Sequence, residues 1–75
     1  MKAIEELIKD GGEITLGAIG DAECAASAAD GSNALALLVR REGETLNALL
    51  KRLDRAIARH FETGETTDEI NSPSD

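Results

Sequence analysis

Carboxylates are the most numerous reactive groups in this sequence. Fifteen Asp and Glu residues stand against eight Lys and Arg, which gives a formal net charge of −7. Carboxylates accept charge-assisted hydrogen bonds from arginine and lysine, so a group of them on one surface can bind a cationic partner. The same charge argues against a nucleic-acid-binding protein, because a polyanion is bound by lysine and arginine, which displace its counterions. The chemistry that this composition favours is electrostatic recognition on an exposed surface.

The charges are unevenly distributed along the chain. Residues 1–39 carry seven acids and two lysines, a net charge of −5. Residues 40–61 carry six bases and three acids, a net charge of +3, and residues 62–75 carry five acids and no base, again −5. The molecule is therefore predicted to be polarised, with a basic segment between two acidic ones.

Several acids fall on or beside predicted strands. Same-face residues of a strand are about 6.6 Å apart and neighbouring strands about 4.8 Å apart, so strand pairing would project Glu13, Asp21 and Glu23 from one face of a sheet. Such like charges destabilise a small fold, and a basic partner that accepts carboxylates in place of phosphates would explain them. The candidate partner-binding residues are these three, an acid at a hairpin end and three acids near the N-terminus: Glu13, Asp21, Glu23, Asp30, Glu5, Glu6 and Asp10.

Two alternatives stay open for the acids. An acidic excess also favours solubility and needs no partner. Near the C-terminus, Glu65, Asp68 and Glu69 form either a second acidic patch or part of a solvating tail.

The remaining side chains give little support to catalysis or metal binding. Cys24 and His60 could meet as a nucleophile and a base, but a buried core cysteine and a histidine at a helix end are the simpler interpretation. One cysteine and one histidine cannot build the usual three- or four-ligand zinc site. The bases of residues 40–61 have no interleaved aromatic residues for stacking, which favours a solvated helix face. We therefore expect no enzyme, no metal, no cofactor and no direct contact with nucleic acid.

Hydrophobic periodicity divides the chain into short elements. Residues 2–9 carry an apolar stripe at helical spacing, and two glycines follow it. Residues 13–19 alternate between apolar and polar side chains, which predicts a half-buried strand. Its inward-facing residues would be Ile14, Leu16 and Ala18.

Residues 22–29 are ambiguous. Alternation would bury Cys24 and the even-numbered alanines, whereas alanine itself favours a helix by about a few tenths of a kcal/mol. Turn signals on both sides and neighbouring strands favour a strand, and a short helix is the alternative. Residues 34–40 form a nearly continuous apolar run, typical of a strand covered on both faces.

The clearest element is an amphipathic helix from Thr45 to Phe61. Its apolar residues recur at i, i+3, i+4 and i+7, and its charged residues take the opposite face. Glu44 or Thr45 can cap its N-terminus. The apolar stripe contains Leu46, Leu49, Leu50, Leu53, Ala56, Ile57 and Phe61, and the polar face contains Asn47, Lys51, Arg52, Asp54, Arg55 and Arg59.

These elements predict an α+β fold with a short N-terminal helix, a three-stranded antiparallel meander and a long C-terminal amphipathic helix packed on the sheet. Residues 1–62 form a single domain, and residues 63–75 are expected to be an acidic, flexible tail. The single cysteine leaves no internal disulfide, which fits a reducing cytosol. No apolar run suits a transmembrane helix, and acids interrupt any signal-peptide pattern. We expect a cytoplasmic protein without membrane contact.

The segment from Arg40 to Asn71 also resembles known sequences. Its pattern RRxGETLxxLLxRLDxAI, followed by TDEIN, is similar to the C-terminal half of small proteins from phages and prophages of proteobacteria. The pattern covers a little over 40% of the chain and marks structural positions, namely a strand end, a turn and a capped helix.

As a short, acidic chain without a catalytic constellation, the protein resembles the anti-CRISPR family, in particular the small inhibitors of type I-C systems. The resemblance implies a monomer, encoded by a phage or prophage, that inhibits a Cascade surveillance complex in the bacterial host cell. Several such inhibitors mimic duplex DNA, and their carboxylates occupy the basic surface that recognises the protospacer-adjacent motif. The acids named above would then form that mimic.

Two other interaction functions remain open. The chain could be a phage assembly module that pairs through its long helix, around Leu46, Leu50 and Ile57. It could also be an antitoxin-like protein that neutralises a basic toxin. In these alternatives the acidity serves mainly solubility.

Overall fold

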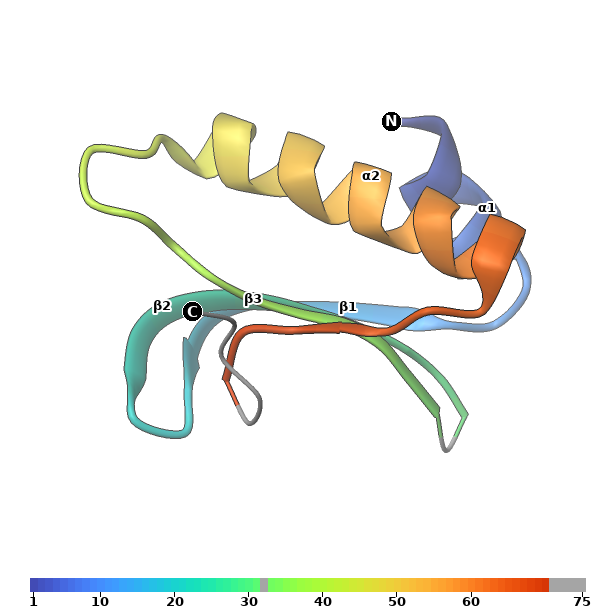
Figure 1. Cartoon of the computed structure of the whole chain (residues 1–75), viewed down its shortest axis with the longest axis horizontal. Coiled ribbons are helices and arrows are strands. Elements are labelled where there is room, and N and C mark those ends of the chain that lie inside the picture. The colour runs from blue at the N-terminus through green and yellow to red at the C-terminus, as the bar shows by residue number, and fades with distance from the viewer. Residues whose placement is uncertain (32, 71–75) are drawn as a thin grey trace.

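Two helices cover one face of a small β-sheet (Figure 1). The computed structural model describes residues 1–31 and 33–70. The predicted α+β fold, with a short helix, an antiparallel meander and a long helix packed on the sheet, is confirmed. The elements in chain order are α1 (Lys2–Lys9), β1 (Glu13–Ile19), β2 (Ala22–Asp30), β3 (Asn33–Val39), α2 (Leu46–Thr63) and β4 (Thr67–Asp68).

The strands lie in the order β1-β2-β3-β4. The first three are antiparallel, and β4 pairs with β3 in parallel after the chain has crossed the sheet through α2. This two-residue strand is an addition to the predicted meander, and it lies in the segment that the sequence assigns to the tail. Residues 71–75 of that segment lie outside the described residues.

The ambiguous segment 22–29 is a strand, β2, which pairs with β1 on one side and with β3 on the other. Pairing along both edges outweighs the modest helix propensity of alanine. Ala26 and Ala28 are fully buried and let α2 approach the sheet closely. The largest fully buried side chains of the core are Leu7, Leu35, Leu38, Leu49, Leu53 and Ile57.

An irregular pairing explains the continuous apolar run in β3. Ala28 pairs with Ala36 and Ala29 pairs with Ala34, so Leu35 is an extra residue between the two pairs. At a bulge of this kind, neighbouring side chains no longer alternate strictly between the faces. Leu35 and Ala36 are consequently both fully buried.

The predicted burial of β1 is only partly right. Ile14 packs against the core, but Leu16 is 41% exposed and Ala18 is exposed as well. The register with β2 shifts between Gly17 and Ile19, and Gly17 has a φ of 138° that favours glycine. At this end the sheet curves away from the helices (Figure 1), so the second half of β1 leaves the core.

The long helix α2 begins at the predicted cap. Thr45 Oγ1 accepts a hydrogen bond from the main-chain N–H of Ala48 at 3.0 Å. The helix ends at Gly64, whose φ of 77° is the left-handed conformation common at helix C-termini. Its apolar stripe packs on β2 and β3, but the two ends of the predicted stripe, Leu46 and Phe61, are exposed.

Two contacts fix the short helix α1, which is too short to be stable alone. Asp54 of α2 accepts a hydrogen bond from the main-chain N–H of Ile4 at 2.9 Å and so caps the first turn of α1. Gly12, after the helix, leaves no room for a side chain, because a Cβ atom there would lie 2.5 Å from Leu7 Cδ1 and 2.8 Å from the Ala29 oxygen. These contacts place α1 over β1.

Candidate partner-binding surface

The meander of β1, β2 and β3 is acidic and has no basic residue. No lysine or arginine occurs between Lys9 and Arg40. Its four acids are all exposed, and the structure shows no ion pair between them and any residue in 1–31 or 33–70. They are the four sheet acids singled out by the sequence: Glu13, Asp21, Glu23 and Asp30.

Alternation along the strands places two of these acids on the face of the sheet that the helices leave open. Glu13 precedes Ile14, and Glu23 precedes Cys24; both of these neighbours pack against the core under the helices. Since successive side chains of a strand point to opposite faces, Glu13 and Glu23 project from the other face.

The four sheet acids form two pairs at opposite ends of the sheet. Glu13 lies opposite Ala29, the neighbour of Asp30, whereas Asp21 lies in the β1–β2 turn close to Glu23. The length of β1 separates the two pairs by about 20 Å. The register therefore places two acids near each end of the sheet, and not the single group of Glu13, Asp21 and Glu23 that the sequence suggests.

The surroundings of the two pairs differ. Glu23 lines a hollow of about 400 Å³ together with Arg40, Arg41 and Glu42 of the loop after β3. The two arginines outnumber Glu42 there and so reduce the negative potential around this pair. The pair of Glu13 and Asp30 lies at the other end of the strands, away from that loop.

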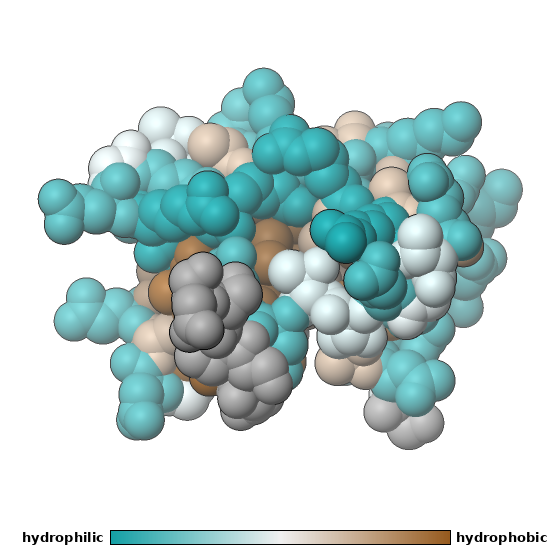
Figure 2. All heavy atoms as spheres, viewed as in Figure 1, coloured by the Kyte–Doolittle hydropathy of each residue, from teal (hydrophilic) through white to brown (hydrophobic). Residues whose placement is uncertain are grey.

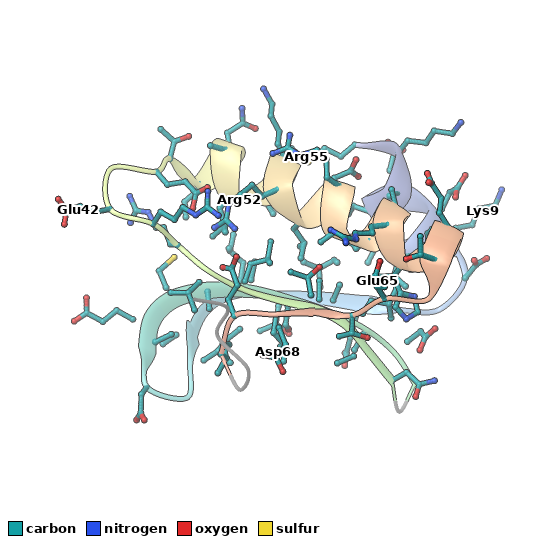
Figure 3. All side chains as sticks on the ribbon, viewed as in Figure 1. Lys9, Glu42, Arg52, Arg55, Glu65 and Asp68 are labelled. Atoms are coloured by element: carbon teal, nitrogen blue, oxygen red, sulfur yellow. The ribbon has the colours of Figure 1, made fainter. Side chains whose placement is uncertain are left out.

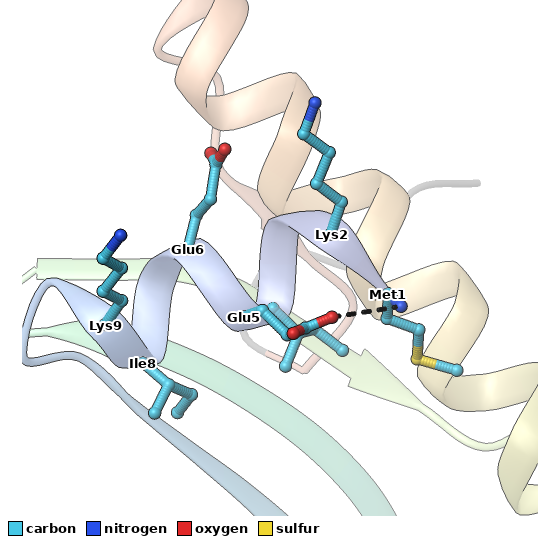
Figure 4. Close-up of a pocket in the computed structure, with 7 residues that line it drawn as sticks. Met1, Lys2, Glu5, Glu6, Ile8 and Lys9 are labelled. Carbon is cyan, nitrogen blue, oxygen red and sulfur yellow. Dashed lines mark ion pairs between the residues drawn. The ribbon is translucent and has the colours of Figure 1, made fainter.

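The acids of the N-terminal flank lie on or just after α1, on the helix side of the sheet. Glu5 pairs with the N-terminal ammonium group of Met1 at 3.8 Å. Figure 4 shows Glu6 on the same side of α1 as Lys2 and Lys9. These acids are thus mixed with positive charges and are separate from the acids of the open sheet face, with Asp10 exposed after the helix.

The acids of the C-terminal segment are bound within the molecule. Glu65 pairs with Arg59 at 3.2 Å, and Glu69 pairs with Arg52 at 3.0 Å. Asp68 accepts a hydrogen bond at 2.9 Å from the main-chain N–H two residues further along the chain. Glu65 and Glu69 therefore attach the segment from Gly64 onwards to α2, whereas this bond of Asp68 lies within the segment.

Arg52 is the centre of that attachment. Its Nε lies 2.7 Å from Glu44 Oε2, and its Nη2 lies 3.0 Å from Glu44 Oε1, a two-point contact. Its Nη1 donates to Glu69 at 3.0 Å, and its Nη2 also donates to the main-chain oxygen of Val39 at 2.9 Å. The side chains of Arg52 and Glu44 are only 13% and 9% exposed, so solvent screens this contact weakly.

This network changes the acidity of its members. The hydrogen bond from Arg52, followed by that from the main-chain N–H of Arg41, lowers the pKa of Glu44 from 4.5 to about 2. The same contact with Glu44 raises the pKa of Arg52. Helical periodicity assigned Arg52 to a solvated face, and that assignment is wrong because the loop before α2 and the segment after it both fold over the side chain.

Glu69 also closes one edge of the sheet. Its Oε1 accepts the main-chain N–H of Val39 at 2.9 Å, and its own N–H donates to the oxygen of Leu37 at 2.7 Å. Thr66 adds a longer bond to the oxygen of Ala34 at 3.3 Å. Figure 3 shows Arg52 reaching from α2 towards the segment that contains Asp68. The β3 edge is therefore occupied by the chain itself.

A narrow hollow of about 330 Å³ remains between α2 and β4. Leu38 and Ala56 supply apolar lining, and Figure 2 shows hydrophobic atoms in a gap among hydrophilic ones on this face. Three arginines of α2 also line it, namely Arg52, Arg55 and Arg59. Of these, Arg52 pairs with Glu69 and Arg59 pairs with Glu65, as described above.

The structure also locates the residues of the alternative functions. The main-chain oxygen of Cys24 accepts a hydrogen bond from the N–H of Arg40, in the loop that leads to the start of α2. His60 lies in the last turn of α2. About 20 Å of helix therefore separates the two side chains. Of the residues named for helix pairing, Ile57 is fully buried and Leu50 packs against the core, which leaves Leu46 exposed.

Among residues 1–31 and 33–70, no group of three or more His, Cys, Asp or Glu side chains is placed to hold a metal ion. No helix in these residues combines the length and the apolar character that a membrane span requires.

Comparison with known proteins adds no relative. No protein-family model matches this chain, and neither a curated protein nor a solved structure is significantly similar to it.

Proposed function

We propose that this protein is a non-enzymatic inhibitor that places the acids of its meander on a cationic surface of a partner. The observation that carries the proposal is the stretch of residues 10–39, which contains five acids and no lysine or arginine. Two of these acids, Glu13 and Glu23, project from the open sheet face. Uncompensated like charges destabilise a small domain. A basic partner would supply the positive charges that residues 10–39 lack.

The spacing of the sheet acids suits two separate points of contact. B-DNA carries about one charge per 1.7 Å of axis, so about twelve phosphate charges lie within 20 Å. The sheet offers two carboxylates at each end of a similar length. It therefore replaces two local groups of phosphates and not a continuous backbone. The pair of Glu13 and Asp30 has the more negative potential of the two, because Arg40 and Arg41 lie beside Glu23.

The partner we propose is the DNA-binding surface of a type I-C Cascade complex. The resemblance of the chain to small anti-CRISPR inhibitors supplies this identity, and the acidic open face is compatible with it. Bound there, the carboxylates would take hydrogen bonds from the arginines and lysines that otherwise bind the protospacer-adjacent motif. The protein would act stoichiometrically, as a monomer, in the host cytoplasm.

A displacement experiment tests the proposal. Purified type I-C Cascade is loaded with a fluorescent duplex that carries the motif, and the protein is titrated in while fluorescence anisotropy is recorded. We expect displacement that weakens as salt rises. The double variant Glu13→Lys with Asp30→Lys should displace the duplex at least about tenfold less well, since it reverses one entire pair.

A matched control carries the same change in net charge elsewhere. Glu62→Lys with Glu65→Lys reverses two exposed acids at the C-terminal end of α2, outside the meander, and should weaken displacement by no more than about twofold. Circular dichroism confirms that both variants fold. Equal losses in the two double variants would contradict a site on the meander, and the absence of any displacement by the natural protein would contradict the proposed partner.

A further inference from the structure

The two edges of the sheet differ in how their main-chain groups are hydrogen-bonded. At the β3 edge, β4 and the side chain of Glu69 occupy the main-chain groups of Leu37 and Val39. At the other end of the strand order, β1 pairs with β2 alone among residues 1–31 and 33–70. One row of main-chain donors and acceptors along β1 therefore faces outwards, the arrangement that accepts an additional strand.

Apolar side chains accompany the open edge. Leu16 of β1 is 41% exposed and shares a strand face with Ile14, the face over which α1 lies. Met1, the residue before α1, is 44% exposed, and Ile8 of α1 is 50% exposed. Three of the five exposed large hydrophobic side chains of the described residues thus belong to β1, to α1 and to the residue before α1. A shallow hollow of about 650 Å³ lies along α1, with Ile8 on its wall (Figure 4).

The usual devices that keep an edge strand from pairing are few in β1. It contains no lysine and no proline, and its one charged residue is Glu13. The positive φ of Gly17 interrupts the regular backbone, which leaves Glu13–Leu16 as the part that can pair. These four residues present two apolar side chains to the helix side, and Glu13 and Thr15 to the open side.

We propose that the β1 edge binds an extended segment of a cationic partner as an added strand. The segment would alternate apolar and basic residues. Its apolar side chains would lie beside Ile14 and Leu16 on the helix side of the sheet, and its lysines or arginines would lie beside Glu13 on the open face, because opposite residues of paired strands share a face. The cationic character of the partner rests on the proposed function, whereas the main-chain pairing is new.

Charge decides between this partner and a second copy of the chain. Each copy carries a net charge of −7 and would bring its own Glu13 to the shared edge. Like charges gathered at an interface oppose association. A basic strand instead supplies the counter-charge that residues 10–39 lack.

The probe is a short labelled peptide of alternating lysine and valine, titrated with the natural protein while fluorescence anisotropy is recorded. Two further peptides carry N-methyl groups, one on every valine and the other on every lysine. The N–H groups of alternate residues in a strand point to opposite edges, so only one methylated set meets β1. We expect one methylated peptide to lose binding by about tenfold or more and the other to bind like the parent.

Variants of the protein locate the site. Leu16→Lys should weaken binding of the parent peptide by about tenfold, and Ile8→Lys serves in its place if that variant does not fold. Leu46→Lys is the matched control, because Leu46 is 47% exposed on α2, and it should bind unchanged.

The possible failures point to different conclusions. Equal binding of all three peptides would overturn strand addition and leave an electrostatic site in place. A self-association detected by sedimentation and abolished by Leu16→Lys would overturn the cationic occupant. Failure of the parent peptide to bind, while the protein still displaces DNA from Cascade, would overturn the edge proposal alone. Failure of both would overturn the proposed function as well.

Discussion

The acids of the meander and the acids of the C-terminal half of the molecule have opposite environments. In the C-terminal half, Glu44, Glu65 and Glu69 each pair with an arginine of α2 at 3.2 Å or less. In the meander, Glu13 and Asp30 are exposed at one end of the sheet, and the structure shows no ion pair for them within residues 1–31 and 33–70. The same residue types therefore stabilise one region and, within the described residues, stay exposed without such an ion pair in the other.

The position of the arginines produces this difference. All six bases after residue 39 lie between Arg40 and Arg59, on α2 and the loop before it. They reach the segments that flank the helix, and Arg52 links both of them to the oxygen of Val39. They do not reach the far end of the meander. A surface available to a cationic partner is thus indicated by acids that lack ion pairs with the chain's own arginines, and not by the number of acids.

The largest effect is expected where the internal network is broken. Arg52→Met removes the donors of Glu44, Glu69 and Val39 and should lower the free energy of unfolding by about 2–3 kcal/mol. Urea unfolding followed by circular dichroism measures it. Arg55→Met changes an exposed arginine of the same helix and should leave the stability within about 0.5 kcal/mol. Similar losses in the two variants would show that the network adds no stability.

A smaller effect is expected from acid. The pKa of Glu44 is lowered to about 2, so the folded state binds fewer protons at this group than the unfolded chain does. Its stabilising contribution is complete above pH 4.5, the ordinary value, and is lost as the pH falls through about 2. Unfolding of the natural protein and of Glu44→Gln, measured between pH 6 and pH 2, should show stabilities that converge as the pH falls. A constant difference across this range would contradict the assignment.

The smallest effect is expected in the meander, and its sign is reversed. Glu13→Gln with Asp30→Asn removes two like charges that lack internal partners, so the melting temperature should rise by about 1–2 °C at low salt. The gain should disappear at high salt, where the repulsion is screened. Differential scanning calorimetry resolves it. A lower melting temperature would mean that these carboxylates have stabilising contacts inside the molecule.

Local patterns predicted most of the fold. The 3.6-residue period and the Thr45 cap placed α2 correctly, and two turn signals were sufficient to identify β2 despite its alanines. The errors arose where distant segments meet. The exposure of Leu16 follows from a register shift between two strands, and β4 is a two-residue strand held by Glu69. Neither has a local signal.

The candidate site was predicted in part for the same reason. The alternation of apolar and polar residues correctly placed Glu13 and Glu23 on the open face, because such alternation depends only on neighbouring residues of a strand. The separation of the sheet acids into two pairs depends on strand length and register. The role of Arg52 depends on two segments that fold over a helix face which periodicity alone describes as solvated.

The most direct test of the contrast between the two regions is a titration of the isotope-labelled protein with a lysine hexapeptide, followed by two-dimensional NMR of the main-chain amides. We expect the largest shifts at Glu13 and Asp30, with smaller shifts at Asp21 and Glu23 and almost none at Glu44 and Glu69. Shifts that are largest at Glu44 and Glu69, or that are spread evenly over all the acids, would contradict this expectation.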